Sequence, residues 1–340
     1  MAKAKIIRRL NCSAPASTGI KLVLATRFKE MLEWRDVALD WTDPEGVHSM
    51  RVASRRLRST LRDFAPYLHK RPLTSAGKKL KHVADTLGEV RDLDVALLAF
   101  AEIKTEAPPA LVGGFTQFVE AREALREKAR EALKAVFEKD LPALESQFVA
   151  GIDKAATPRG SSDGRKPELT FAEMSRAVIL DRLREFEKAS SGLFKPLDVE
   201  ALHDMRIAVK RLRYAIELFQ KCWGRSMWVF AQRAARIQTA LGDLHDCDIW
   251  IQSLGKHINR ARKQKQDEQV AALVWLLSHF VKLRTKHMRR ALDHWREWER
   301  HNTSGRLREI LAVPTETDEI LPPPESAGTT ANGLGNQPSP

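Results

Sequence analysis

An internal repeat constrains this chain more than any other feature of its sequence. Residues 48–58 read HSMRVASRRLR and residues 203–213 read HDMRIAVKRLR, with seven of eleven positions identical at an offset of 155. A second pair of blocks follows at an offset of 154, TLGEVRDLD at 86–94 and ALGDLHDCD at 240–248. Two linked blocks at nearly the same offset indicate a duplicated unit of about 150 residues. The chain should therefore fold into two similar halves.

Both halves are expected to be helical. Apolar residues recur at helical spacing along most of the chain, and alternating Val/Ile/Thr-rich runs typical of strands are absent. The pattern predicts an all-α fold of two pseudo-symmetric helical bundles. It places helices at about 18–39, 45–69, 74–103, 112–155, 169–191, 198–221, 225–256 and 264–300. Asp43 before Pro44 is a typical helix start, because an aspartate can cap the free N–H groups and proline suits the first turn.

Composition shifts predict where the folded part begins, divides and ends. Residues 1–14 are expected to be a flexible N-terminus, and residues 15–312 to be one folded domain. Within it, repeat 1 should cover about 15–156 and repeat 2 about 169–312. The linker of about 157–168 contains TPRGSSDGRKP, which is rich in residues that break helices. Residues 313–340, rich in Pro, Gly, Ser and Thr, are expected to form a disordered tail.

The charge of the chain points to an anionic partner. The formal net charge is +13 and the isoelectric point is about 9.8, and such an excess favours nucleic acid, a phosphate polymer or an acidic membrane surface. Cys12, Cys222 and Cys247 lack CxxC spacing and are expected to be reduced thiols. No run of residues resembles a signal peptide or a membrane span. These features predict a cytoplasmic protein.

The repeated first block places its cations on one helical face, because positions i, i+3, i+7 and i+10 lie close together on a helix. In the second copy Glu217 replaces the arginine that extends the first stripe, Arg62. No acid lies among the cations of either stripe, although the chain interleaves Glu with Lys and Arg elsewhere. We interpret a bound anion as the missing counter-charge. The two stripes are His48, Arg51, Arg55 and Arg58, and His203, Arg206, Lys210 and Arg213.

The opposite sides of the two motif helices carry the apolar residues expected to face a core. These residues are Met50, Leu57 and Leu61 in the first copy and Met205, Leu212 and Phe219 in the second.

The second block is expected to lie on a neighbouring helix and to add to the cationic surface. Lys79 and His82 precede it in the first half and correspond to Arg233 and Arg236 in the second. Four aspartates could ligate a metal, but pairing with nearby arginines is favoured, and no metal site is expected. They are Asp92, Asp94, Asp246 and Asp248. Gly88 and Gly242 are expected to permit close packing of helices.

With these paired blocks the chain resembles the CHAD family, the conserved-histidine α-helical domain, over about residues 15–312. The resemblance implies two halves whose basic helices face a shared cleft, and binding of inorganic polyphosphate, in some members at polyphosphate granules. The implied ligand residues are His48, Arg51, Arg55, Arg56, Arg58, His203, Arg206, Lys210, Arg211 and Arg213. Arg91 matches the family's second block, whereas His245 stands where an arginine is usual.

The residues and the resemblance together predict a non-catalytic protein that binds inorganic polyphosphate or another polyanion without a cofactor. The complete site is expected to comprise these ligand residues together with Lys79, His82, Arg91, Arg233, Arg236 and His245. The two motif histidines, with an ordinary pKa of about 6.5, are expected to strengthen binding at mildly acidic pH.

Two other functions remain open. A nucleic-acid-binding protein would explain the charge, although the stripes contain almost no aromatic residues on which bases could stack. A metal-dependent phosphohydrolase could use His203, Asp204, His245, Asp246 and Asp248. The first half has Ser49 and Arg91 in place of Asp204 and His245, which argues against that reading. Protein partners are not predicted.

Overall fold

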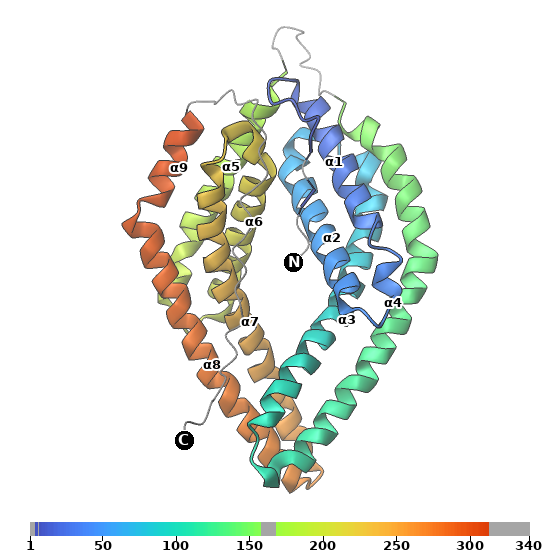
Figure 1. Ribbon diagram of the computed structural model, residues 1–340, viewed down its shortest axis with the longest axis vertical. Helices are drawn as coiled ribbons and strands as arrows, with labels where there is room; N and C mark the ends of the chain where they lie inside the picture. The colour runs from blue at the N-terminus through green and yellow to red at the C-terminus, as the bar shows by residue number, and fades with distance from the viewer. Residues whose placement is uncertain (1–3, 6, 158–167, 313–340) are drawn as a thin grey trace, which may run out of the picture.

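In this computed structural model, the described residues are 4, 5, 7–157 and 168–312, and they form α-helices joined by short 3₁₀ turns and loops (Figure 1). Across these residues no β-strand is present, only one isolated bridge between Pro15 and Thr170. The predicted all-α fold is confirmed. Nearly all of the predicted linker and the whole predicted tail lie outside the described residues.

The order of long helices is the same in the two halves. The first half contains α1 (Ala16–Leu32), α2 (Pro44–Phe64), α3 (Thr74–Thr105) and α4 (Val112–Ala155). The second contains α5 (Phe171–Ala189), α6 (Val199–Trp223), α7 (Met227–Lys263) and α8 (Asp267–Arg300), followed by α9 (Thr303–Ala312). The 3₁₀ turns are η1 (Val37–Leu39), η2 (Ala65–Tyr67), η3 (Arg71–Leu73), η4 (Pro109–Leu111) and η5 (Ser190–Phe194).

The predicted helices match eight of these elements, with differences at some ends. The first ends at Leu32 rather than near residue 39, because the chain turns there and continues as η1. Helix α7 runs seven residues past its predicted end at 256. Helix α9 was not predicted; it is separated from α8 by His301 and Asn302, and Asn302 has a left-handed φ of 44°.

The two motif helices begin in the same way. Asp43 caps α2 by accepting a hydrogen bond from the backbone N–H of Glu45, as its sequence predicts. Asp198 caps α6 by accepting from the backbone N–H of Ala201. The two caps are 155 residues apart, so each motif histidine lies at the same distance into its helix. The caps therefore fix the register of both basic stripes.

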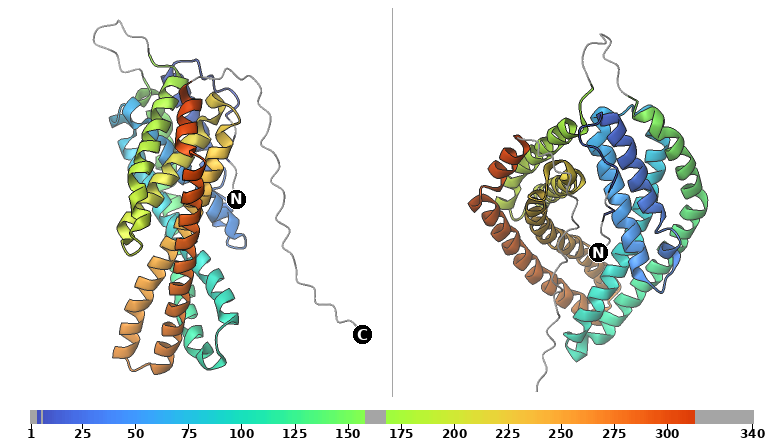
Figure 2. Two further views of the ribbon diagram at one scale, coloured as in Figure 1. Left: turned by 90° about the vertical axis from the view of Figure 1, so that its left-hand side faces the viewer. Right: turned by 45° about the horizontal axis from the view of Figure 1, so that its top comes forward.

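The halves share one hydrophobic core and are not two independent bundles. Figures 1 and 2 show α1–α4 on one side of the molecule and α5–α9 on the other. The large core cluster draws residues from both sides, including Phe64 of α2, Phe171 of α5 and Phe219 of α6. The ring centroids of these three lie 5.5–6.2 Å apart. The predicted pair of bundles is thus fused through α2, α5 and α6.

A second hydrophobic cluster joins the halves at the other end. The α3–α4 and α7–α8 hairpins meet at the lower end of the molecule in Figure 1. Phe100 of α3 lies at its centre, with ring centroids 5.4 Å from Phe118 and 4.8 Å from Trp250. Joined at two ends, the halves are held in a fixed relation, and so are α2 and α6.

From residue 7 onward, the N-terminal segment that was predicted to be flexible over 1–14 packs against the second half. Ile7 and Leu10 are buried, and the backbone N–H groups of Phe171 and Ala172 donate to the carbonyls of Ala14 and Cys12. Residues 1–3 and 6 lie outside the described part of the chain.

The predicted reduced state of the cysteines is wrong for two of the three. Cys12 and Cys222 form a disulfide, with their Cα atoms 5.5 Å apart, a usual separation for such a bond. They are 210 residues apart in the sequence, and only the fold brings them together. Cys247 is a free, buried thiol, as predicted. None of the helices in the described ranges is long and apolar enough to cross a membrane.

Candidate anion-binding site

The motif helices α2 and α6 contact each other and present cations on the sides that do not face the core. Met50, Leu57, Met205, Leu212 and Phe219 are buried and Leu61 is packed against the core, as predicted. The cations of the two halves lie close enough to shift one another's pKa. We call this group the central basic cluster. It comprises His48, Arg51, Arg55, Arg62, Arg91, His203, Arg206, Lys210, Arg211 and His245.

Lys210 shows most directly that the two stripes converge. Burial, together with the charges of Arg55, Arg206, Arg62 and Arg211, lowers its pKa from 10.5 to about 7. Two of these arginines come from α2 and two from α6. In the described part of the chain Lys210 forms no ion pair, and neither does Arg55. The cluster therefore concentrates positive charge without a full set of counter-charges.

Arg51 and Arg206 occupy equivalent positions in the two halves. Burial lowers the pKa of both guanidinium groups, and each feels the charges of Asp92 and Asp246 from both halves. Arg51 donates to Asp92 at 2.9 Å, but that carboxylate is largely exposed. Asp246 is exposed too, and desolvation by the surrounding protein raises its pKa. Accessible acids of this kind can be replaced by a stronger anion.

The two motif glycines have a different role from the one expected. A Cβ atom on Gly88 would lie 3.7 Å from Nε of Arg51, and one on Gly242 would lie 3.9 Å from Nε of Arg206. These are ordinary contacts with a side chain, so close packing of helices does not require glycine here. Each glycine instead lies next to the motif arginine of its own half, Gly88 beside Arg51 and Gly242 beside Arg206.

The histidines of the cluster are harder to protonate in the free protein than an ordinary imidazole. Burial lowers the pKa of His48 and His203 below 6.5, with further lowering by Arg91 and Arg206 respectively. The rings of His203 and His245 lie 4.8 Å apart, and burial together with Arg206 lowers the pKa of His245 to about 4. A bound anion would oppose these effects and favour the protonated imidazoles.

Arg56 and Arg211 are held by acids that the sequence reasoning missed. Glu30 of α1 lies 3.3 Å from Arg56 and also pairs with Arg27 at 2.6 Å. Glu185 of α5 lies 3.3 Å from Arg211 and also pairs with Arg182. The two Arg-x-x-Glu pairs, Arg27/Glu30 and Arg182/Glu185, repeat at the offset of 155, so the sequence repeat could have identified them. These contacts orient Arg56 and Arg211 at the edge of the stripes.

Arg58 and Arg213 are likewise paired. Arg58 lies 3.4 Å from Asp85, and Arg213 donates to Glu217 at 2.8 Å. Glu217, which stands where the first stripe has Arg62, therefore offsets part of the charge of the second stripe.

Lys79, His82, Arg233 and Arg236 lie apart from the central basic cluster. Lys79 pairs with Asp140 of α4 at 2.7 Å, and His82 lies 3.7 Å from the same carboxylate. Arg233 donates to Thr303 of α9 at 2.9 Å, and Arg236 lies 3.5 Å from Glu297 of α8. These side chains project toward α4, α8 and α9 rather than toward the facing motif helix. The expected extension of the cationic surface is not formed by them.

The predicted pairing of the motif aspartates with arginines is confirmed for Asp92, Asp94 and Asp248, whereas Asp246 forms no ion pair among the described residues. Asp94 lies 3.8 Å from Arg130 across the α3–α4 hairpin, and Asp248 lies 2.6 Å from Arg284 across the α7–α8 hairpin. Arg130 and Arg284 are themselves 154 residues apart. These two pairs link the helices of the equivalent α3–α4 and α7–α8 hairpins at the end of each second sequence block.

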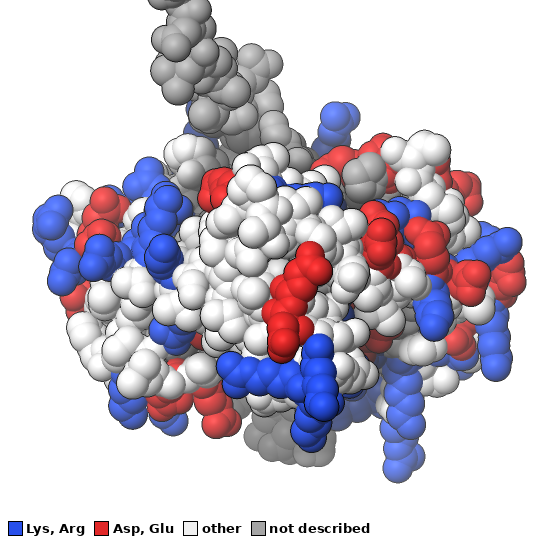
Figure 3. All heavy atoms as spheres, turned by 90° about the horizontal axis from the view of Figure 1, so that it is seen from below, with Lys and Arg blue, Asp and Glu red and all other residues white. Residues whose placement is uncertain are grey.

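The hairpin end of the molecule does not carry a continuous basic surface. Seen from below, Lys and Arg side chains are scattered among Asp and Glu side chains around a largely uncharged middle (Figure 3). The central basic cluster therefore does not continue over this face of the molecule.

Comparison with curated proteins finds two relatives in Mycobacterium tuberculosis, the uncharacterized proteins Rv2226 and MT2285. Each is 28% identical over 249 residues. The match covers 69% of this chain and 45% of each relative. The chain thus spans less than half the length of the curated relatives it matches.

Solved structures share the fold. The CHAD domain from the plant Ricinus communis superposes with a TM-score of 0.65 at 21% identity, over 92% of this chain and 97% of that one. PptA from Streptomyces chartreusis superposes with a TM-score of 0.64 at 13% identity, over 83% of this chain and 100% of that one. The family model of the CHAD domain matches residues 22–255, which include both motif helices. The chain therefore belongs to the CHAD domain family.

Proposed function

We propose that this protein binds inorganic polyphosphate without catalysing its breakdown, and that the central basic cluster is the binding site. The observation that carries the proposal is the position of Lys210 among four arginines drawn from both motif helices. A linear polyanion in contact with α2 and α6 together would neutralise cations that the protein itself leaves unbalanced.

The chemistry of the cluster suits phosphate oxygens. Arginine can donate two parallel hydrogen bonds to a phosphate group, and charge-assisted bonds of this kind are stronger than neutral ones. Partial burial of Arg51, Arg206 and Lys210 reduces screening by salt and strengthens each contact. Polyphosphate offers no base edges or rings, so contacts to oxygen alone are sufficient. Membership of the CHAD family supports the same ligand.

A location in the cytoplasm, at polyphosphate granules, is part of this proposal. The cysteines no longer argue for it, because two of them form a disulfide.

The proposal is tested by calorimetric titration with long-chain polyphosphate at fixed ionic strength. The variant Arg51→Ala/Arg206→Ala should bind at least about 100-fold more weakly, since it removes two hydrogen-bonding cations and each hydrogen bond to a charged group contributes roughly 1.5–3 kcal/mol. Lys79→Ala/Arg233→Ala is the matched control, because it also removes two equivalent cations but lies outside the cluster. Equal losses in the two variants would move the site elsewhere.

The same preparation separates the alternative functions. Long-chain polyphosphate should displace bound single-stranded and double-stranded nucleic acid, whereas a dedicated nucleic-acid-binding protein would resist displacement. Release of orthophosphate from polyphosphate on addition of Mg²⁺ or Mn²⁺ would contradict the non-catalytic function.

A further inference from the structure

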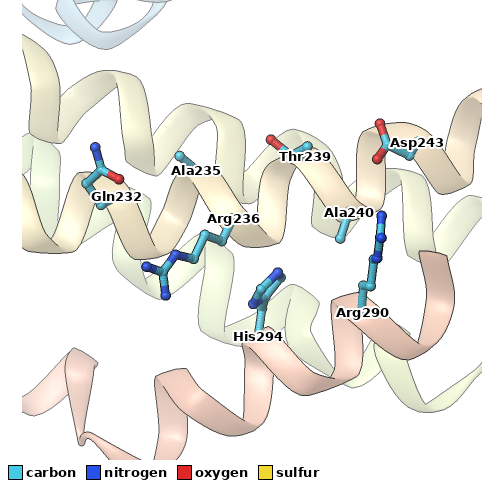
Figure 4. Close-up of a pocket in the computed structure, with 8 residues that line it drawn as sticks. All are labelled: Gln232, Ala235, Arg236, Thr239, Ala240, Asp243, Arg290 and His294. Carbon is cyan, nitrogen blue, oxygen red and sulfur yellow. The ribbon is translucent and has the colours of Figure 1, made fainter. Parts of the chain in front are cut away.

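A cavity of about 320 Å³ lies between α7 and α8, outside the central basic cluster (Figure 4). This volume is at the lower end of the roughly 300–1,000 Å³ range of small-ligand pockets. In Figure 4 Arg236 extends from α7 toward α8, and Arg290 and His294 extend from α8 toward α7. The polar lining is completed by Gln232, Thr239 and Asp243.

The equivalent place in the first half is filled by an acid of the chain itself. At the offset of 154, Asp140 corresponds to His294, His82 to Arg236 and Val136 to Arg290. The Asp140 carboxylate lies 2.7 Å from Lys79 Nζ and 3.7 Å from His82 Nε2. The lysine hydrogen bond holds the pKa of Asp140 below its ordinary value. In the first half, the Asp140 carboxylate therefore occupies the space next to these cations between α3 and α4.

The second half has lost that internal oxyanion and gained cations. His294 replaces the aspartate, and Arg290 replaces an apolar valine. The acids that remain nearby are weakly engaged. Arg236 lies 3.5 Å from Glu297, and both side chains are about half exposed. Such surface pairs contribute little free energy and can exchange for a stronger partner.

The other acid of the cavity is Asp243, which lies 3.4 Å from Nδ1 of His287. Burial raises the pKa of Asp243, so its charged form is disfavoured there. Arg290 forms no ion pair within 4 Å among the described residues, although its charge partly opposes the effect of burial on the pKa of Asp243. Nδ1 of His294 is buried without a hydrogen bond, although it faces Glu297 at 3.7 Å. The hydrogen-bond donors that line the cavity therefore have only distant or solvent-exposed acceptors in the protein itself.

We propose that this cavity is a second anion site, which binds a small phosphate-bearing ligand in the place that the Asp140 carboxylate fills in the first half. Arg236 and Arg290 pair with the phosphate oxygens, and His294 and Thr239 donate hydrogen bonds. The phosphate group could belong to a free small molecule or to the end of a polyphosphate chain held elsewhere on the protein. The inference does not depend on the central basic cluster.

The test uses inorganic pyrophosphate as the probe, with binding followed by calorimetry and by the imidazole NMR signals of His294. Wild-type protein should bind with a saturable shift of those signals. His294→Asp restores the internal carboxylate and should weaken binding at least tenfold, and Arg290→Gln should do the same. Lys134→Gln, an exposed change of equal charge on α4, should bind as the wild type does. Circular dichroism checks that each variant is folded.

Two further arms identify the source of the phosphate and isolate the site. Arg51→Ala/Arg206→Ala should retain pyrophosphate binding at the cavity, whatever happens to its polyphosphate affinity. If long-chain polyphosphate shifts the His294 signals in wild-type protein but not in this variant, the occupant is the end of a chain held at the cluster. The second site is overturned if all variants, including both cavity variants, bind pyrophosphate equally, or if pyrophosphate leaves the His294 signals unmoved.

Discussion

At the scale of single residues, the central basic cluster contains cations whose charged forms are disfavoured by partial burial and by one another. Lys210 is half-buried, and its pKa of about 7 means that it is partly neutral in the free protein at physiological pH. A bound phosphate would favour the charged form and raise this pKa again. Ligand binding and proton uptake are therefore linked at this residue.

At pH 8, binding of polyphosphate should be accompanied by uptake of protons from the buffer. Lys210 is mostly neutral in the free protein at that pH and becomes charged when its pKa rises in the complex. Affinity should accordingly fall as the pH rises above 7. Calorimetry in two buffers with different heats of ionisation measures the uptake. Lys210→Arg should bind without it, because arginine stays charged; equal uptake in both proteins would contradict the assignment.

Replacing Lys210 with an apolar residue should stabilise the free protein. The folded state lowers the lysine pKa from 10.5, so the unfolded chain binds more protons between about pH 7 and 10.5, and wild-type stability rises with pH across that window. The destabilisation caused by the charged lysine is therefore fully present below pH 7. Lys210→Met should raise the free energy of unfolding by about 1–2 kcal/mol at pH 6, as when other buried charges are replaced. Urea denaturation at pH 6 and pH 10 tests this, and a gain that is larger at pH 10 would contradict it.

At the scale of helices, α1 and α5 support the motif helices through the same Arg-x-x-Glu pair. The two copies differ in burial. The side chains of Arg27 and Glu30 are 7% and 4% exposed, whereas that of Glu185 is 34% exposed. Removal of a buried acid leaves its cationic partners without compensation, while an exposed pair is screened by solvent.

The difference in burial predicts unequal costs for the same substitution. Glu30→Gln should lower the free energy of unfolding by about 3 kcal/mol, because the buried Arg27 and the adjacent Arg56 both lose their contact with the Glu30 carboxylate. Glu185→Gln should cost about 1 kcal/mol or less, since its pairs are partly exposed. Denaturant unfolding of the two variants measures the difference. A larger loss for Glu185→Gln would mean that burial does not set the strength of these pairs.

At the scale of the whole molecule, contacts between the halves fix the relation of the two basic stripes. Asp63 at the end of α2 accepts a hydrogen bond from Arg182 of α5 at 2.8 Å, and both side chains are buried. The disulfide adds a covalent link from the N-terminal segment to the end of α6. The α3–α4 and α7–α8 hairpins complete the frame at the other end.

The disulfide should stabilise the fold against unfolding. It joins residues 210 positions apart, so it removes much conformational freedom from the unfolded chain, and such bonds typically contribute about 2–4 kcal/mol. Reduction, or the variant Cys222→Ser, should lower the melting temperature. Cys247 is the internal control, because it is buried and its pKa is raised to about 12, so it should resist alkylation in the folded protein. A melting temperature unaffected by reductant would argue against the link.

The sequence by itself determined the helical class, most helix positions, the core-facing residues of the motif helices and the presence of two equivalent basic stripes. These features are local or periodic, because capping by Asp43 and the spacing of His48, Arg51 and Arg55 depend only on neighbouring residues. The tertiary structure decided which cations lie close together in the central basic cluster. Arg55 and Lys210 belong to different halves, and their proximity depends on how two helices pack, whereas Lys79 and Arg233 share the motif's periodicity but project toward other partners. The disulfide between Cys12 and Cys222 and the lowered pKa of the histidines also required the fold. Pairing between distant residues and burial are properties of the folded chain, and neither is encoded in local spacing.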